Sequence, residues 1–285
     1  MAASDTYTTI GLRDMLLLNQ QPENAGAFEE YLSMLKRDAV ARPVIYVGTG
    51  TCGMIAGAGE TLQAIWTYLN EKEIDAEVVE VGCIGFCVHE PLVDVQLPGK
   101  RRVSFSRITQ AMVEPLLDDI LNAVVPEENV LGQYSHPHHE AWDNVRVLGE
   151  MPFFRLQNRL VLRNCGIINP FSIEESIARG GYKSLTRVLR NYSSDKVCEI
   201  IEDSGLRGRG GGGFPTGKKW KTALNTPGDE RFLICNGDES DPGAFMDRSR
   251  FEGDPHKIIE GVAIAAYAIN AHKSYIYVRA EYTLA

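Results

Sequence analysis

A glycine-rich stretch between basic residues has the clearest capacity for chemistry in this sequence. Residues 204–220 read SGLRGRGGGGFPTGKKW, with four consecutive glycines between two arginines and two lysines. Glycine has no Cβ, so a ligand can lie against the backbone and several N–H groups can turn toward one anion. Basic side chains beside them suit a phosphate. The stretch therefore predicts a phosphate site, because the alternative, a flexible linker, rarely carries Phe214, Pro215 and Trp220.

Two familiar phosphate motifs fit this stretch only in part. The glycines have the G-x-G-x-x-G spacing of dinucleotide-binding loops, but that motif should follow a strand. The preceding residues 195–203 have the apolar spacing of a helix instead. The P-loop pattern fits up to Lys218, after which Lys219 stands where Ser or Thr should bind Mg²⁺. We therefore expect a ligand other than ATP.

A group of acidic and amide side chains follows the next expected strand. Residues 231–236 predict a short buried strand, residues 255–271 a helix and residues 274–278 a second strand. This order is a βαβ unit with a parallel sheet, whose ligands bind at the carboxyl ends of the strands. The side chains at that end are Asn236, Asp238, Glu239 and Asp241. A solvated acidic turn is the alternative, and the nearby glycine-rich stretch favours a binding site.

Three of the six cysteines lie in expected loops near the N-terminus. Cys83 and Cys87 are four residues apart, a spacing that lets two thiolates reach one cluster. Cys52, in a turn expected over residues 48–53, follows the first strand and could meet them in space. The others stand singly among apolar residues, as buried small side chains do: Cys165, Cys198 and Cys235. Without a secretory signal, thiols or metal ligands are favoured over disulfides.

Residues 204–220 and 235–250 together resemble the flavoprotein subunit of NADH:quinone oxidoreductase and the related diaphorase subunits of NAD-linked hydrogenases and formate dehydrogenases. The resemblance runs from about residue 152 to the C-terminus. It implies that FMN lies on the glycine-rich loop and that NADH stacks on the flavin. The residues that it assigns to FMN are Gly208, Arg209, Gly210, Gly211, Gly212, Lys219, Asn236, Asp238 and Glu239.

The same resemblance implies the contacts of the nicotinamide nucleotide. Phe214 would stack against NADH, and Glu239 and Asp241 would line its pocket, with Glu239 as the catalytic-site residue. No side chain needs to act as nucleophile or general base, because the flavin supplies the chemistry. The chain departs from the family at Asp241, where many members have Glu, and at Thr222, where an aromatic that stacks on adenine is common.

The N-terminal cysteines resemble those of the thioredoxin-like [2Fe–2S] ferredoxin subunit of the same complexes, which has C-x4-C followed by C-x3-C. Cys52 matches the second ligand, and Cys83 and Cys87 match the third and fourth. Val47 stands at the first position and cannot bind iron, whereas such a cluster normally has four ligands. Three alternatives follow: a ligand from another residue or subunit, a lost cluster that leaves a structural domain, or a thiol redox pair.

The expected elements divide this α/β chain into four parts. Residues 1–40 form a helical segment, which we expect to pack on the chain itself rather than on a partner. Residues 41–126 have the βαβ-ββα order of a thioredoxin-like domain of ferredoxin type, with strands near 44–47, 76–81, 92–97 and 102–105. Residues 127–151 are expected to be a polar linker. Residues 152–285 form the first part of a Rossmann-like FMN/NADH-binding α/β domain.

Members of the family continue beyond this point, with a second nucleotide motif and four cysteines that bind a [4Fe–4S] cluster. None of these motifs lies in the 285 residues, so we expect that cluster only where the chain is longer, and weak FMN binding by these residues alone.

Composition limits the choice of partners and location. The net charge of −9 and a pI near 5.3 argue against nucleic acid or an anionic membrane as the main partner. The sequence holds no uncharged apolar run of ~18 residues, so it predicts no membrane span. It also has no basic start followed by an apolar segment, which indicates a cytoplasmic protein, free or peripheral to a membrane complex.

The sequence thus predicts an NADH-oxidising subunit that passes hydride to FMN and then single electrons to iron–sulfur clusters. Its partners would be the iron–sulfur and electron-acceptor subunits of the same complex. The alternatives are a non-catalytic docking or scaffold subunit that retains the fold, and a thiol redox module that uses Cys83 and Cys87. The terminal acceptor, the choice between NADH and NADPH and the oligomeric state stay open at this level.

Overall fold

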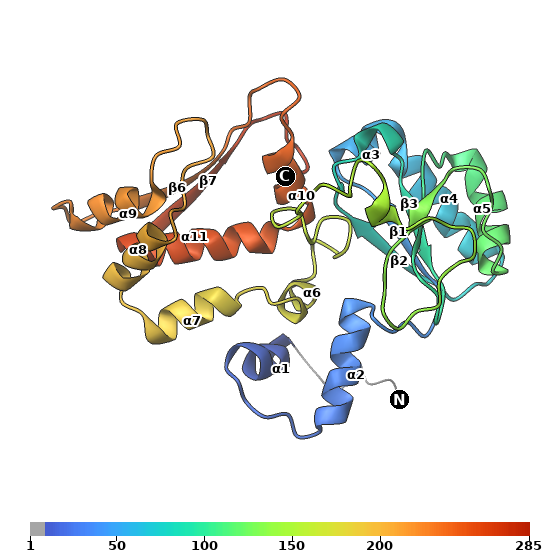
Figure 1. Cartoon of the computed structure of the whole chain (residues 1–285), viewed down its shortest axis with the longest axis horizontal. Helices are drawn as coiled ribbons and strands as arrows, with labels where there is room; N and C mark the ends of the chain where they lie inside the picture. The colour runs from blue at the N-terminus through green and yellow to red at the C-terminus, as the bar shows by residue number, and fades with distance from the viewer. Residues whose placement is uncertain (1–8) are drawn as a thin grey trace.

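Two separate β-sheets organise the chain in a computed structural model that describes residues 9–285 (Figure 1). The first sheet has the strand order β2-β1-β3-β4-β5, and the second pairs β6 with β7. Helices cover both sheets, so the expected α/β class is confirmed. Within residues 9–285, none of the helices has the length and apolar character needed to cross a bilayer.

The first sheet has the topology expected of a thioredoxin-like domain. Its strands are β1 (Val44–Gly48), β2 (Glu77–Val81), β3 (Val93–Gln96), β4 (Val103–Phe105) and β5 (Val130–Gln133). β1 and β2 are parallel and are joined through α3 (Thr51–Ala56) and α4 (Ala58–Glu71). β3 pairs antiparallel with β1 and with β4, and α5 (Val113–Leu121) closes the unit. This βαβ-ββα order confirms the prediction for this part of the chain.

The thioredoxin-like part of the chain, called the first lobe below, has its hydrophobic core between the first sheet and the helices α4 and α5. Apolar side chains at helical spacing on α4 and α5 meet the Val- and Ile-rich strands, and the most deeply buried include Ile45, Ile65, Val95, Phe105 and Leu117. Burying such side chains is worth about 1.5–3 kcal/mol each, before the entropy cost of ordering them. This packing fixes the β2 and α3 ends from which the cysteines project.

Residues 127–151 differ from the expected linker. β5 pairs antiparallel with β4, so part of this segment completes the first sheet. The side chain of Gln133 accepts a hydrogen bond from the Trp142 N–H and donates to the Trp142 and Val145 carbonyls, and Trp142 is buried in the core. A four-residue strand is too short for alternation to be recognised among polar neighbours.

The second sheet has the expected parallel βαβ arrangement. β6 (Phe232–Gly237) and β7 (Lys273–Val278) are parallel and are joined by α10 (Met246–Gly253) and α11 (Pro255–Ile269). α11 packs against the sheet and against α7 (Lys183–Asn191), α8 (Ser194–Asp203) and α9 (Thr216–Asn225) (Figure 1). The strand β6 is less buried than expected, because its alternate apolar residues Phe232 and Ile234 stay largely exposed. Tyr275 and Tyr277 of the neighbouring strand β7 are exposed as well.

The N-terminal helices pack on the second half of their own chain, as expected. α1 (Thr9–Leu12) continues into a π-helical turn at Arg13–Leu17, and α2 (Ala25–Lys36) begins after Pro22. Leu12 and residues of α2 form a small core with α6 (Ile173–Ala178). Residues 1–8 of the segment expected at 1–40 lie outside the described part of the chain.

Arg37 joins three of these parts. Its guanidinium donates to Glu77 of β2 at 2.7 Å and to both carboxylate oxygens of Glu175 of α6 at 2.8 Å. The side chains of Arg37 and Glu175 are 10% and 6% exposed. Because removing one member leaves a buried charge unpaired, this ion pair should be costly to break.

We expect Arg37→Met to lower the free energy of unfolding by about 3 kcal/mol, because it leaves the buried Glu175 carboxylate unpaired with Arg37. Urea unfolding followed by circular dichroism measures the change. Arg42→Met is the control, because Arg42 and its partner Asp75 are 50% and 80% exposed; exposed pairs are worth about 1 kcal/mol or less. Equal effects of the two substitutions would contradict the role given to Arg37.

Candidate functional site

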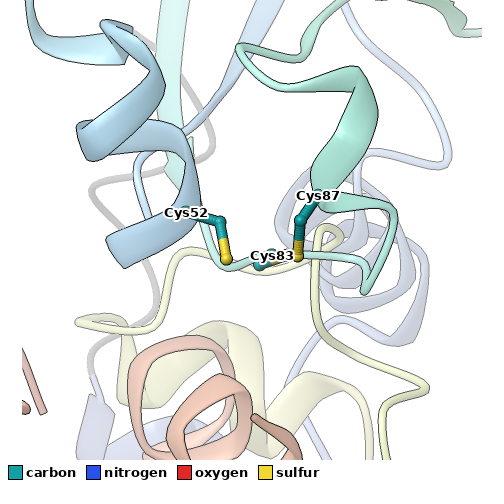
Figure 2. Close-up of side chains that lie close together, drawn as sticks. All are labelled: Cys52, Cys83 and Cys87. Atoms are coloured by element: carbon teal, nitrogen blue, oxygen red, sulfur yellow. Dashed lines mark hydrogen bonds between the residues drawn. The ribbon is translucent and has the colours of Figure 1, made fainter. Parts of the chain in front are cut away.

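Three thiols meet at the carboxyl end of β2 (Figure 2). Cys83 follows β2, Cys87 begins the short 3-10 helix η3 (Cys87–His89), and Cys52 lies in the first turn of α3. Their Sγ atoms all lie within 4.8 Å of one another, and those of Cys83 and Cys87 are 3.6 Å apart. The expectation that Cys52 meets the other two is confirmed. The turn expected at residues 48–53 is wrong from Thr51 onward, where α3 begins.

The spacing of the thiols suits a metal centre with a missing ligand. Two thiolates on one tetrahedral metal atom lie about 3.8 Å apart, which the Cys83–Cys87 distance matches. Val47, at the position where the family has another cysteine, is fully buried in the hydrophobic core of the first lobe. It offers no donor atom, so the cysteines alone supply three ligands.

Arg248 links these thiols to the second half of the chain. It lies on α10, is 8% exposed and donates a hydrogen bond from Nη2 to Cys52 Sγ at 2.9 Å. The hydrogen bond from Cys83, together with the Arg248 charge, lowers the pKa of Cys52 to about 6. The hydrogen bond to Cys52 and burial raise the pKa of Cys83, and burial raises the pKa of Cys87. One of the three thiols is therefore ionised at neutral pH in the metal-free protein.

Close backbone contacts hold α10 against the thiols. A Cβ built on Gly82 would lie 2.3 Å from the Cα of Gly253, so these two glycines allow the two lobes to touch beside Cys83. Glu252 accepts hydrogen bonds from the Thr51 N–H, at 2.8 Å, and from the Thr51 hydroxyl. The start of α3 is thus tied to the end of α10.

Glu239, the residue assigned to the catalytic site from sequence, lies at the other end of α10. Its carboxylate accepts hydrogen bonds from the N–H groups of Asp247 and Arg248, at 3.2 and 3.3 Å. A carboxylate at a helix N-terminus is favoured by the helix dipole. Arg279 and Tyr282 both donate to the Glu239 carbonyl. Glu239 is therefore firmly held, and α10 runs from it to the residues that touch the thiols.

The glycine-rich loop is closed at its base and open at its tip. Gly208 N–H donates to the Phe214 carbonyl and Thr216 N–H to the Leu206 carbonyl, each at 2.9 Å. Gly211 has φ +95°, a conformation that glycine tolerates and side chains rarely adopt. Among the described residues, none accepts a hydrogen bond from the N–H groups of 210–213. The tip therefore keeps free donors for an external anion.

The helix α9 adds positive charge to this loop. It begins at Thr216, directly after the loop, so the partial positive charge of its N-terminus lies beside the free N–H groups. Lys218 and Lys219 are exposed in its first turns, and within residues 9–285 neither pairs with a carboxylate. Donors, dipole and charge together fit a phosphate.

The remaining predicted residues surround the open end of β6. Asn236 Oδ1 accepts a hydrogen bond from the Asp238 N–H at 2.9 Å and borders a cavity of about 310 Å³ between β6, α10 and α11. Arg209, Phe214 and Asp241 are exposed. In the described part of the chain, no hydrogen bond joins the loop at 208–214 to the turn at 236–241. The structure brings the thiols together, but it does not join these two segments directly.

Glu90 is a polar group at the thiols that sequence reasoning missed. It is 6% exposed, and burial raises the pKa of its carboxyl to about 7. The sequence signal was an acidic residue three positions after Cys87, inside an otherwise apolar stretch.

Comparison with known proteins finds similar sequences for the C-terminal part of the chain. Residues 201–285 match the model of the Nuo51 FMN-binding domain. The resemblance to these flavoprotein subunits is confirmed. The chain is 50% identical over 129 residues to the NADP-reducing hydrogenase subunit HndC of Solidesulfovibrio fructosivorans, covering 45% of this chain and 26% of that protein. It is 53% identical over 111 residues to an NADH-quinone oxidoreductase subunit of Aquifex aeolicus (strain VF5), covering 39% and 26%. The matched part thus spans about a quarter of these curated relatives.

Solved structures with low overall similarity include two kinds of protein. One is an NAD⁺-reducing [NiFe]-hydrogenase in the air-oxidized state, with a TM-score of 0.32 and 22% identity over 95% of this chain and 46% of that chain. The other is a thioredoxin-like [2Fe–2S] ferredoxin from Aquifex aeolicus, with a TM-score of 0.29 and 17% identity over 35% and 100%. Because these scores are low, the fold assignment depends on the strand order alone.

In metal-free protein we expect Cys52 to be alkylated by iodoacetamide at pH 7, and its rate to fall as the pH drops through about 6. The reason is that the thiolate, not the thiol, is the nucleophile. Peptide mass spectrometry over a pH series measures the rate. Arg248→Met should shift this profile to higher pH, whereas the buried Cys165, whose pKa burial raises to about 11, should stay unmodified at pH 7. An unchanged profile in the variant would contradict the pairing with Arg248.

Proposed function

We propose that this chain is part of an NADH-oxidising flavoprotein subunit, a diaphorase, of a multi-subunit oxidoreductase. The observation that carries the proposal is the glycine-rich loop with its free N–H donors. It lies within the residues that match the Nuo51 FMN-binding domain. FMN, when bound, accepts a hydride and releases electrons one at a time.

The residues of the loop would bind and orient the flavin. The free N–H groups of residues 210–212 and the exposed Lys219 would hold the phosphate, where free donors and positive charge meet. Gly208, whose N–H closes the base of the loop, would let the ligand lie against the backbone. Arg209 would add a second positive charge. Asn236 and Asp238, at the carboxyl end of β6, would complete the site, since ligands of open α/β sheets bind at such ends.

NADH would bind on the exposed side of the glycine-rich loop and of the turn at residues 236–241. Phe214 is 53% exposed and offers an aromatic face for nicotinamide. Asp241 would reach the ribose hydroxyls as a hydrogen-bond acceptor. Glu239 would work by fixing the acidic turn and the start of α10, because its carboxylate caps that helix. The names of the relatives include both NADP-reducing and NADH-quinone enzymes, so the choice of nucleotide stays open.

The three thiols would form the iron–sulfur site of this chain, where a bound cluster would supply one-electron chemistry. Cys52, Cys83 and Cys87 would hold an iron–sulfur cluster, and Arg248 would offset negative charge at Cys52. Other iron–sulfur and electron-acceptor subunits would pass the electrons on, and a [4Fe–4S] cluster would belong to a longer form of the chain. Such a subunit would work in the cytoplasm, free or peripheral to a membrane complex.

Absorption spectroscopy tests this function. Flavin bands that appear after incubation with FMN, and that NADH bleaches under anaerobic conditions, would support it. A protein that binds no FMN, even as part of its complex, would contradict it and favour a docking subunit that has kept only the fold.

We expect Gly211→Val to abolish flavin retention in the FMN-loaded protein. Its φ of +95° strains a side chain, and a cost of about 1–3 kcal/mol corresponds to a loss of affinity of about five- to 150-fold. The flavin-to-protein absorbance ratio after gel filtration measures this. Gly149→Ala, where a Cβ meets nothing within 4 Å, is the control and should keep the wild-type ratio. Unchanged flavin absorbance in the Val variant would contradict the loop assignment.

Lys219→Gln should weaken FMN binding by about tenfold or more, since a charged hydrogen bond is worth about 1.5–3 kcal/mol. Fluorescence titration with FMN measures the dissociation constant. Lys218→Gln is a matched control at the neighbouring exposed position and should have a smaller effect. The assignment of Lys219 fails if the two variants bind FMN equally well.

A further inference from the structure

We propose that Glu90 supplies the fourth protein ligand of the metal centre formed by Cys52, Cys83 and Cys87. The centre would then have three thiolates and one carboxylate. This inference depends on the iron–sulfur part of the proposed function.

Glu90 is a buried carboxylate with a free oxygen. It follows η3, one residue before Pro91, and is 6% exposed. Its Oε2 accepts a hydrogen bond from the Leu92 N–H at 2.8 Å. Its Oε1 is buried and accepts no hydrogen bond of good geometry in the described part of the chain. The donor beside the carboxylate is the Cys83 thiol, one of the three proposed thiolate ligands. A buried carboxylate oxygen without a partner is costly, and a bound cation would remove that cost.

The carboxylate lies between the end of β1 and the start of α3. A Cβ built on Gly48 would be 3.0 Å from Glu90 Oε2, and one on Gly53 would be 3.3 Å from the same atom. Gly48 is the last residue of β1, and Gly53 directly follows Cys52. Glu90 therefore fills the space between the end of β1 and the start of α3, and the two glycines leave room for it.

The other buried carboxylate beside Cys52 is less suited to bind a metal. Glu252 is 7% exposed and lies near Gly50, but both of its oxygens accept hydrogen bonds from Thr51. It would have to give up these bonds to become a ligand. Glu90 has an oxygen free already.

The four proposed ligands form two pairs. Cys83 and Cys87, with Sγ atoms 3.6 Å apart, would share one iron, and Cys52 and Glu90 would share the other. Carboxylates are harder donors than thiolates and bind iron in many proteins.

The full 285-residue chain, incubated anaerobically with ferrous iron and sulfide and then desalted, provides the test. Iron and sulfide per chain are measured, and the EPR spectrum is recorded after reduction with dithionite. We expect Glu90→Gln to retain less than about a tenth of the wild-type iron, because an amide is a poor iron ligand. Glu252→Gln removes an equally buried carboxylate that is not a ligand and should retain iron.

A second variant separates ligand loss from damage to the fold. Glu90→Cys, which replaces the carboxylate by a thiolate at the same position, should retain iron and sulfide with four thiolates and give an EPR spectrum that differs from that of the wild type. A Glu90→Cys variant that stays empty would overturn the proposal, because the loss in Glu90→Gln would then reflect a damaged domain.

Other outcomes also count against Glu90. Equal iron content and identical EPR spectra of the wild type and Glu90→Gln would overturn the proposal, as would a wild-type chain that retains no iron. Iron loss in Glu252→Gln alone would assign the ligand to Glu252 instead.

Binding of FMN and its bleaching by NADH are measured on the same samples and do not require Glu90. An iron-free protein with an active flavin would refute only this inference, and an iron-loaded protein that binds no FMN would refute only the proposed function.

Discussion

The hydrogen bond from Arg248 to Cys52 joins the two halves of this molecule at the point where chemistry is concentrated. Arg248 belongs to α10, next to the second sheet, and Cys52 to the first lobe. A buried guanidinium needs partners that accept hydrogen bonds, and here a thiol with a lowered pKa is one of them. If the two halves were separated, the Arg248 guanidinium and the Cys52 thiolate would each lose this partner.

Other contacts across the same boundary make this arrangement rigid. Gly82 and Gly253 approach closely enough that no side chain fits between them. Arg102, which is paired with Asp94 inside the first lobe, donates to the Gly166 carbonyl at 2.8 Å. Arg37 adds ion pairs to Glu77 and Glu175. The Gly82–Gly253 contact, with the hydrogen bonds of Arg248 and Glu252, fixes α10 against the first lobe, and α10 connects the acidic turn at Glu239 with the thiols.

Local patterns predicted the elements that depend on local forces. Period-two and helical spacing indicated β1–β4, β6, β7 and the long helices, because the apolar face of each element is visible in its own residues. Ser172 is the N-cap of α6, where its hydroxyl accepts a hydrogen bond from the Glu175 N–H. β5 was missed because its four residues carry little pattern, and the exposed face of β6 was missed because burial depends on distant neighbours.

The amino-acid sequence by itself determined the types of donor present: bare glycine amides beside lysines for a phosphate, and three thiols for a metal. These follow from residue identity and short spacing, which tertiary structure cannot change. Only the folded chain decided which groups meet across long separations. It brought Arg248 to Cys52 and the carboxylate of Glu90 to the end of β1, because strand pairing and close glycine contacts set those distances.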